Sequence, residues 1–131
     1  MKTGSNSSNL FGICPYVTTQ KLLSGKWTIM ILYFLSEHKC RFNELSKKIN
    51  GVTQSALTKQ LRSLELAGLI ERTVFPEIPI RVEYQLSELG HGFSKVLTEI
   101  EQFGNTYNAW LAESKQRAHE DKAEMPAREV V

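Results

Sequence analysis

The apolar positions in the middle of the chain change their period, and this change predicts two helices followed by two strands. In residues 43–49, Leu45 and Ile49 lie one helical turn apart on the buried side, and Asn43 is placed to cap a short helix. In residues 54–66 the leucines recur at intervals of four and three, which predicts a longer helix with one buried face: Leu57, Leu61 and Leu64.

The residues between and after these helices predict a helix-turn-helix. Gly51 can take a positive φ without steric cost, and a turn of this length sets two helices at a wide angle. Thr53 offers a hydroxyl that can cap the second helix, and Gly68 is a good left-handed terminator for it.

Two strands are expected next, because residues 69–74 and 81–86 alternate and contain β-branched and aromatic side chains. Two prolines in residues 75–80 stiffen the connection and keep it out of any ladder. The order predicts a mainly α fold with a small antiparallel β-wing (α+β), a winged helix-turn-helix.

The polar residues of this region have side chains that can bind DNA. Gln pairs bidentately with adenine, Lys and Arg bind guanine or phosphate, and Ser and Thr bind either base edges or phosphate. Arginines that flank the wing suit phosphates. Alternatively, the helix face is only solvated and the hairpin arginines only add solubility. The candidate DNA-binding residues are Thr53, Gln54, Ser55, Thr58, Lys59, Arg62, Arg72 and Arg81.

Two further helices are expected on the N-terminal side. Residues 26–36 are apolar almost all round, so they predict the central buried helix of the domain, and a shorter helix around residues 17–23 precedes it. Trp27 is interpreted as a core residue, with a role in lining a ligand site as the alternative.

The last helix is expected from residue 87 to about residue 113, with apolar positions spaced as in a heptad repeat. Such a seam needs a partner, and a second copy of the chain is its natural cover, with the short first helix adding to the contact. The alternative is a helix that folds back on its own domain. The seam begins at Leu89, and the residues predicted to form the dimer interface are Phe93, Val96, Ile100, Phe103, Tyr107 and Trp110.

Several spaced motifs together carry a family resemblance: Cys14-Pro15, Gly25-Lys26-Trp27-Thr28, Arg41-Phe42-Asn43-Glu44-Leu45, Leu57-Thr58-Lys59-Gln60-Leu61-Arg62, Leu64-Glu65, Pro76-Glu77-Ile78-Pro79-Ile80-Arg81-Val82-Glu83-Tyr84 and Leu86-Ser87-Glu88-Leu89-Gly90. With them the sequence resembles the HxlR family of bacterial regulators over about residues 12–112. The resemblance implies a homodimeric transcription factor with the second helix in the major groove of double-stranded DNA and the wing nearby.

The length and the charge pattern agree with this interpretation. A chain of 131 residues fits one domain, expected at residues 12–113 between a flexible arm (1–11) and a charged, disordered tail (114–131). Residues 21–81 hold ten Lys or Arg against five Asp or Glu, a balance of +5, whereas residues 82–113 hold one against five, a balance of −4. Positive charge therefore gathers on the half predicted to bind DNA.

The two cysteines are candidate thiol sensors. Cys14 precedes the first helix, where exposure and the helix dipole favour a thiolate, and the resemblance implies that some family members sense oxidants or electrophiles with a cysteine here. The alternative is a small apolar residue packed under the arm. Cys40 lies between two cations that lower a thiol pKa, but its place at the entry to the helix-turn-helix favours an unreactive structural role.

Other chemistry has little support in the sequence. His38 and Cys40 lack a second pair of ligands to complete a metal site, and no nucleophile elbow or phosphate-binding loop occurs, so we expect no metal, cofactor or enzyme activity. The longest apolar run is too short to cross a bilayer and no signal core precedes it, which predicts a cytoplasmic protein. The alternative function is a winged-helix module that binds protein without sequence-specific DNA binding.

Overall fold

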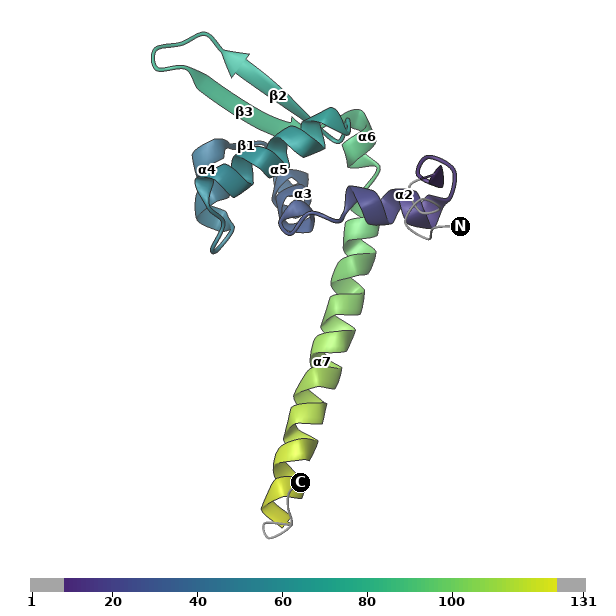
Figure 1. The fold of residues 1–131 in the computed structure, drawn as a ribbon. Helices are drawn as coiled ribbons and strands as arrows, with labels where there is room; N and C mark the ends of the chain where they lie inside the picture. Colours follow the sequence, from purple (N-terminus) through teal and green to yellow (C-terminus); the bar gives the residue numbers. More distant parts are fainter. Residues whose placement is uncertain (1–8, 125–131) are drawn as a thin grey trace. The chain divides into compact units, whose positions relative to one another are not determined.

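The computed structural model describes residues 9–124 and has a mainly helical fold with a small antiparallel sheet, which confirms the predicted fold class (Figure 1). The chain divides into two compact units, one that ends at Ser94 and one that begins at Lys95. The elements are α2 (Pro15–Leu22), α3 (Thr28–Glu37), β1 (Cys40–Arg41), α4 (Phe42–Lys48), α5 (Gln54–Leu66), β2 (Ile70–Phe75), β3 (Arg81–Leu86), α6 (Glu88–His91) and α7 (Ser94–Glu124).

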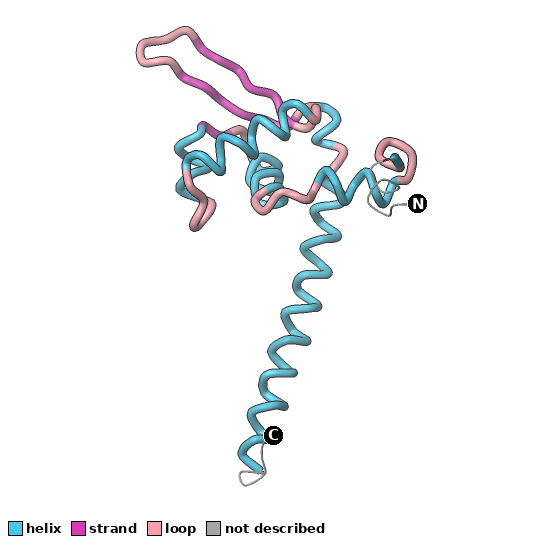
Figure 2. The backbone as a smooth tube through the Cα atoms, in the orientation of Figure 1, coloured by secondary structure: helices cyan, strands magenta, loops and turns pink. Residues whose placement is uncertain are grey.

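The sheet has the strand order β1-β3-β2, with both pairs antiparallel. β2 and β3 form the predicted hairpin, in which Ile70 pairs with Leu86 and Phe75 pairs with Arg81, and the loop between them forms the tip of the wing (Figure 2). β1 was not predicted from the sequence. It pairs Cys40 with Tyr84, so the wing is fastened at its base to the segment that enters α4.

The core of the first unit is built by α3, α4, α5 and the sheet. The buried side of α3 consists of Thr28, Ile31, Leu32 and Leu35, so this helix contributes to the core as predicted, although the apolar residues Met30 and Tyr33 on its other side are exposed. All three predicted leucines of α5 are buried. Trp27 is half-buried, and a Cβ added at Gly51 would lie 3.8 Å from its ring, so Trp27 packs beside the helix-turn-helix turn.

The ends of the two helices are set by local hydrogen bonds. The Thr53 hydroxyl accepts from the backbone N–H of Ala56 at 3.1 Å, which confirms the predicted cap of α5. The prediction that Asn43 caps α4 was wrong. The helix begins earlier, because the Glu44 carboxylate accepts from the backbone N–H of Arg41 at 2.8 Å and draws that residue into the capping position.

The end of α5 is joined to the wing and to α6. Gly68 has φ +83°, as predicted, and the amide of Leu69 donates to the carbonyl of Leu64, which closes the helix in a Schellman motif. The Ser87 hydroxyl donates to the Gly68 carbonyl at 2.6 Å and accepts from the Gly90 amide at 3.0 Å. Gly90 approaches so closely that an added Cβ would stand 2.0 Å from the Leu69 carbonyl oxygen.

The C-terminal helix differs from its prediction at both ends. A break around Gly92 separates α6 from α7, so Leu89 and Phe93 do not lie on the same helix as the later seam residues. Helix α7 extends to Glu124 rather than ending near residue 113, so residues 114–124 of the predicted tail are helical. Of the predicted arm and tail, residues 1–8 and 125–131 lie outside the described part of the chain.

Candidate nucleic-acid interface

The outer face of α5 presents a row of exposed polar side chains. With Phe42 from α4 they line an open depression in the surface of the first unit. The Thr58 hydroxyl donates to the carbonyl of Gln54 at 2.9 Å, which leaves its oxygen as an acceptor. The residues that the structure brings together here are five of the predicted set: Gln54, Ser55, Thr58, Lys59 and Arg62.

This face continues onto the base of the wing. A second hollow of about 300 Å³ is bounded by Thr58 and Arg62 from α5, by Arg72 from β2 and by Tyr84 from β3, with Glu65 at its side. Arg72 is exposed. The exposed polar face of α5 therefore continues to the strand that begins the wing.

The basic residues of this surface have no internal partners. Among residues 9–124, Lys59, Arg62 and Arg72 take part in no hydrogen bond and no ion pair with other side chains. Their charge is available to an anion, which is what a phosphate contact requires.

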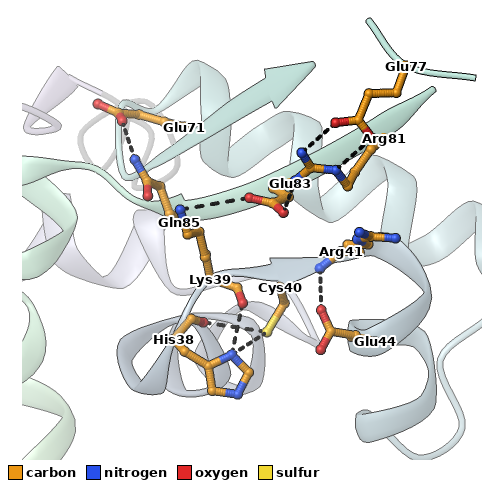
Figure 3. Close-up of polar contacts among 10 residues, drawn as sticks. All are labelled: His38, Lys39, Cys40, Arg41, Glu44, Glu71, Glu77, Arg81, Glu83 and Gln85. Carbon is orange, nitrogen blue, oxygen red and sulfur yellow. Dashed lines mark hydrogen bonds and ion pairs between the residues drawn. The ribbon is translucent and has the colours of Figure 1, made fainter. Parts of the chain in front are cut away.

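Arg81 is arranged differently from the other predicted cations. Figure 3 shows its guanidinium between Glu77 and Glu83: Nε and Nη2 donate to Glu77 at 3.2 and 2.8 Å, and Nη1 donates to Glu83. It also stacks on the Phe75 ring, with 3.7 Å between Cζ and the ring centroid. The hydrogen bond from Arg81 lowers the pKa of the Glu77 carboxyl, and the same bond raises the pKa of Arg81.

The other carboxylates near Arg81 on the hairpin have partners as well. Glu83 also lies 3.9 Å from Lys39 Nζ, and Gln85 donates to Glu71 at 3.1 Å on the same side of the hairpin (Figure 3). Arg81 is therefore half-buried and neutralised within the wing, and its geometry does not fit the predicted phosphate contact by an unpaired cation.

Helix α5 is held in place by a contact that the sequence reasoning did not single out. Thr28 Oγ1 at the start of α3 donates to Gln60 Oε1 at 2.9 Å. The backbone at Gly25 lies so close that an added Cβ would stand 2.2 Å from Gln60 Oε1. Gln60 lies between the buried residues Leu57 and Leu61 and the outer face of α5. This position is the sequence signal that could have predicted its contact with α3.

The two cysteines lie in different environments. Cys14 is half-buried and occupies the residue before the first turn of α2. Cys40 is only 1% exposed, and its thiol donates to the His38 carbonyl at 3.5 Å. Burial raises the pKa of the Cys40 thiol, against the lowering effect of Lys48, so the structural role fits Cys40 better than the role of a sensor.

Helix α7 carries an exposed row of aromatic rings. Phe103, Tyr107 and Trp110 are 68%, 47% and 52% exposed, and their centroids are 6.1 and 5.3 Å apart along the row. Val96 and Ile100 continue this row at intervals of three and four. The predicted seam is therefore present from Val96 to Trp110 as one stripe on one helix.

The described part of the chain contains neither a metal-binding cluster nor a membrane-spanning helix. In residues 9–124, no three His, Cys, Asp or Glu side chains gather closely enough to hold a metal ion. Each helix within that range is too short or too polar to span a bilayer.

Comparison with known proteins identifies relatives of the chain. Residues 22–120 match the HxlR-like helix-turn-helix family. The chain is 42% identical over 101 residues to YdeP of Bacillus subtilis (strain 168), an uncharacterized HTH-type transcriptional regulator, and the match covers 77% of this chain and 79% of YdeP.

Solved structures of the same kind resemble the fold. The redox regulator HypR in its reduced form has a TM-score of 0.72 and 32% identity, with 76% of this chain and 99% of that chain covered. The reduced transcriptional regulator YodB from B. subtilis has a TM-score of 0.64 and 30% identity, with 72% and 94% covered. The relatives are regulators and not enzymes, as predicted. The chain belongs to the HxlR-like helix-turn-helix family and is an HTH-type transcriptional regulator.

Proposed function

We propose that this regulator acts in the cytoplasm as a homodimer that binds a near-palindromic operator in double-stranded DNA. The observation that carries the proposal is the outer face of α5, which is exposed, polar and forms no ion pair with any residue from 9 to 124. A helix of this kind fits the major groove, where its side chains meet base edges.

The residues of this face divide into two roles. Gln54 and Ser55 stand at the N-terminal end of α5, which in helix-turn-helix proteins is the part that meets base edges. Thr53 caps the helix at the same end, and Thr58 and Lys59 follow one turn later. Arg62 and Arg72 flank the hollow at the wing base, where they are placed to bind phosphates.

The aromatic row of α7 supports the homodimer. Exposed rings at heptad spacing favour packing against an identical helix, because the same residues would then be covered in both copies. Two copies would set their α5 helices about 34 Å apart, the spacing of successive major grooves on one face of DNA.

DNA binding is tested with duplexes selected from a random-sequence library by the full chain. Gln54→Ala should relax the preference for one base, whereas Arg72→Ala should weaken binding on all sequences and reduce the salt slope by about one. A module that binds only protein would select no duplex, even at low salt, and this result would contradict the proposal.

The homodimer is tested by Phe103→Glu, which places a charge in the aromatic row. Sedimentation should show monomers, and operator binding should fall with the loss of the second half-site. Asn105→Glu adds the same charge at an exposed position outside the row and should remain dimeric. A dimer that persists in Phe103→Glu would contradict the assignment.

We further propose that Cys14 makes operator binding responsive to oxidants or small electrophiles. Two observations support this. Cys14 is more exposed than Cys40. Of the similar structures HypR and YodB, HypR is a redox regulator. A mild thiol oxidant should change operator binding of the wild type and of Cys40→Ser, but not of Cys14→Ser. Whole-protein mass spectrometry that shows an unmodified Cys14 while binding changes would remove Cys14 as the sensor.

A further inference from the structure

The back of α5 is joined to the start of α3 by a polar contact beside apolar side chains. Thr28 is only 3% exposed, and its hydroxyl donates to Gln60 Oε1 at 2.9 Å. The neighbours of Gln60 on the buried side of α5 are Leu57, Leu61 and Leu64. A hydrogen bond has a preferred length and direction, whereas apolar contacts are non-directional. The Thr28–Gln60 bond therefore defines the rotation of α5 about its axis more sharply than the leucines do.

The loop between α2 and α3 leaves no spare room around the same amide group. A Cβ added at Gly25 would stand 2.2 Å from Oε1 and 2.7 Å from Nε2 of Gln60. Both distances are far below the roughly 3.5 Å of an ordinary contact. Gly25 does not have a positive φ, so space and not backbone conformation requires a glycine here. The Gln60 amide is therefore confined between the Thr28 hydroxyl and the backbone at Gly25.

Gln60 does not belong to the outer face of α5. Successive residues of a helix are about 100° apart, so Gln60 points roughly 170° away from the centre of that face. The outer face consists of Gln54, Ser55, Thr58, Lys59 and Arg62. An effect of Gln60 on base recognition must therefore act through the orientation of α5 and not through a contact of its own.

We propose that Gln60 is a positioning residue for base recognition, which fixes the rotation of α5 through the hydroxyl of Thr28. This inference rests on the proposed function and deepens it, because it places part of the operator preference outside the DNA-binding surface.

The effect of a small rotation of α5 differs between base contacts and phosphate contacts. The side chains of a helix lie about 5–6 Å from its axis, so a rotation of roughly 10° moves them by about 1 Å. A shift of this size breaks a hydrogen bond to a base edge. Phosphate contacts made by long, flexible side chains tolerate it better. Loss of the Gln60 contact should therefore reduce specificity more than general affinity for DNA.

The experiment compares the full chain with the variant Gln60→Ala on two duplexes, one that the wild type has selected and one with the same bases in scrambled order. The variant should bind the selected duplex about tenfold more weakly, which is the usual cost of one lost base contact. It should bind the scrambled duplex as the wild type does, with an unchanged salt slope, because its phosphate contacts remain. A purely structural role would lower the thermal midpoint but leave the ratio of the two affinities unchanged in the folded variant.

Thr28→Val tests the same contact without a change in α5. It removes the donor hydroxyl at nearly the same side-chain shape and should also lower the ratio of the two affinities. In the double variant Thr28→Val, Gln60→Ala the two losses should not add, because each change removes the same bond. Ser63→Ala is the matched control, since it removes an exposed polar side chain of α5 outside the outer face and should keep the ratio of the wild type.

The outcomes separate this inference from the proposed function. If the wild type selects no duplex, the proposed function fails and the inference fails with it. If the wild type selects a duplex and Gln60→Ala keeps the ratio of the two affinities, only the role of Gln60 is overturned. A salt slope that falls by about one in Gln60→Ala also overturns it, because that result belongs to a lost phosphate contact. Losses that add in the double variant would show that Thr28 and Gln60 act independently.

Discussion

Helix α5 and the wing both carry basic residues, but they differ in what those residues contact. Lys59 and Arg62 on α5 have no internal partner among the described residues, whereas Arg81 on the wing is held by Glu77 and Glu83. The two regions can therefore make different interactions with the same ligand. The free cations of α5 suit phosphates and bases, whereas the tip of the wing exposes the apolar Ile78 beside a paired Glu77 and Arg81.

This difference shows that a count of arginines overstates the charge that a surface can offer. Binding to DNA gains free energy from counterions that cationic side chains displace from the phosphates. An arginine already paired with two carboxylates gives up those bonds before it can displace anything, so it adds little to this gain.

The largest effect is expected from removal of the free cations of α5. The double variant Lys59→Ala, Arg62→Ala should weaken operator binding on the order of 100-fold and reduce the salt slope by about two. Fluorescence anisotropy across a salt series measures both quantities. Lys115→Ala, which removes an exposed cation from α7, is the matched control and should bind as the wild type.

A smaller effect, with a different signature, is expected from Arg81→Ala. The change removes the partner of Glu77 and leaves Glu83 with Lys39 alone, so binding should weaken about threefold to tenfold through loss of tip order, while the salt slope stays constant. A slope that falls by about one, as for Arg72→Ala, would show that Arg81 binds phosphate and would erase the contrast between the two regions.

Thr53→Ala tests whether α5 depends on its cap to hold this face in position. Loss of the bond from the Ala56 amide should lower the free energy of unfolding by about 1 kcal/mol and the thermal midpoint by roughly 4–8 °C. Ser55→Ala is the matched control, because its hydroxyl makes no hydrogen bond among residues 9–124. Equal midpoints for the two variants would mean that packing alone fixes the helix.

The smallest effect is the response of the wing to pH. Arg81 lowers the pKa of Glu77, so the Glu77–Arg81 pair contributes its full stability to the wing above the ordinary pKa of a glutamate. This stability is lost as the pH falls through the lowered pKa. An NMR titration of the Glu77 side chain should therefore show a midpoint below that of an ordinary glutamate, and Arg81→Ala should raise it. Equal midpoints in both proteins would show that the pair does not form in solution.

The parts of the fold that depend on local chemistry could be predicted from the sequence. The Thr53 cap, the positive φ of Gly51 and Gly68, and the inward leucines of α5 follow from residues close together in the chain. The polar face of α5 followed as well, because a helix with one buried side determines which residues turn outward.

Other parts depend on the path of the backbone and could not be predicted in this way. The pairing of Arg81 follows from the turn at Glu77 and from the spacing to Glu83, and the two-residue strand β1 has too few residues for a periodic signal. The cap of α4 was assigned to Asn43 because capping propensity favours asparagine, yet the Glu44 carboxylate determines the start of that helix. The break around Gly92 shows that an apolar repeat can continue across a helix end.

The hydroxyl of Ser87 joins three segments at once. It donates a hydrogen bond to the carbonyl of Gly68 after α5 and accepts one from the amide of Gly90 in α6. Ser87 itself directly follows the end of β3. A carboxylate at this position could only accept, an ammonium group could only donate, and a methyl group could do neither. Anyone who redesigns this scaffold to recognise a new target should therefore keep an alcohol at this position, with threonine as the natural substitute.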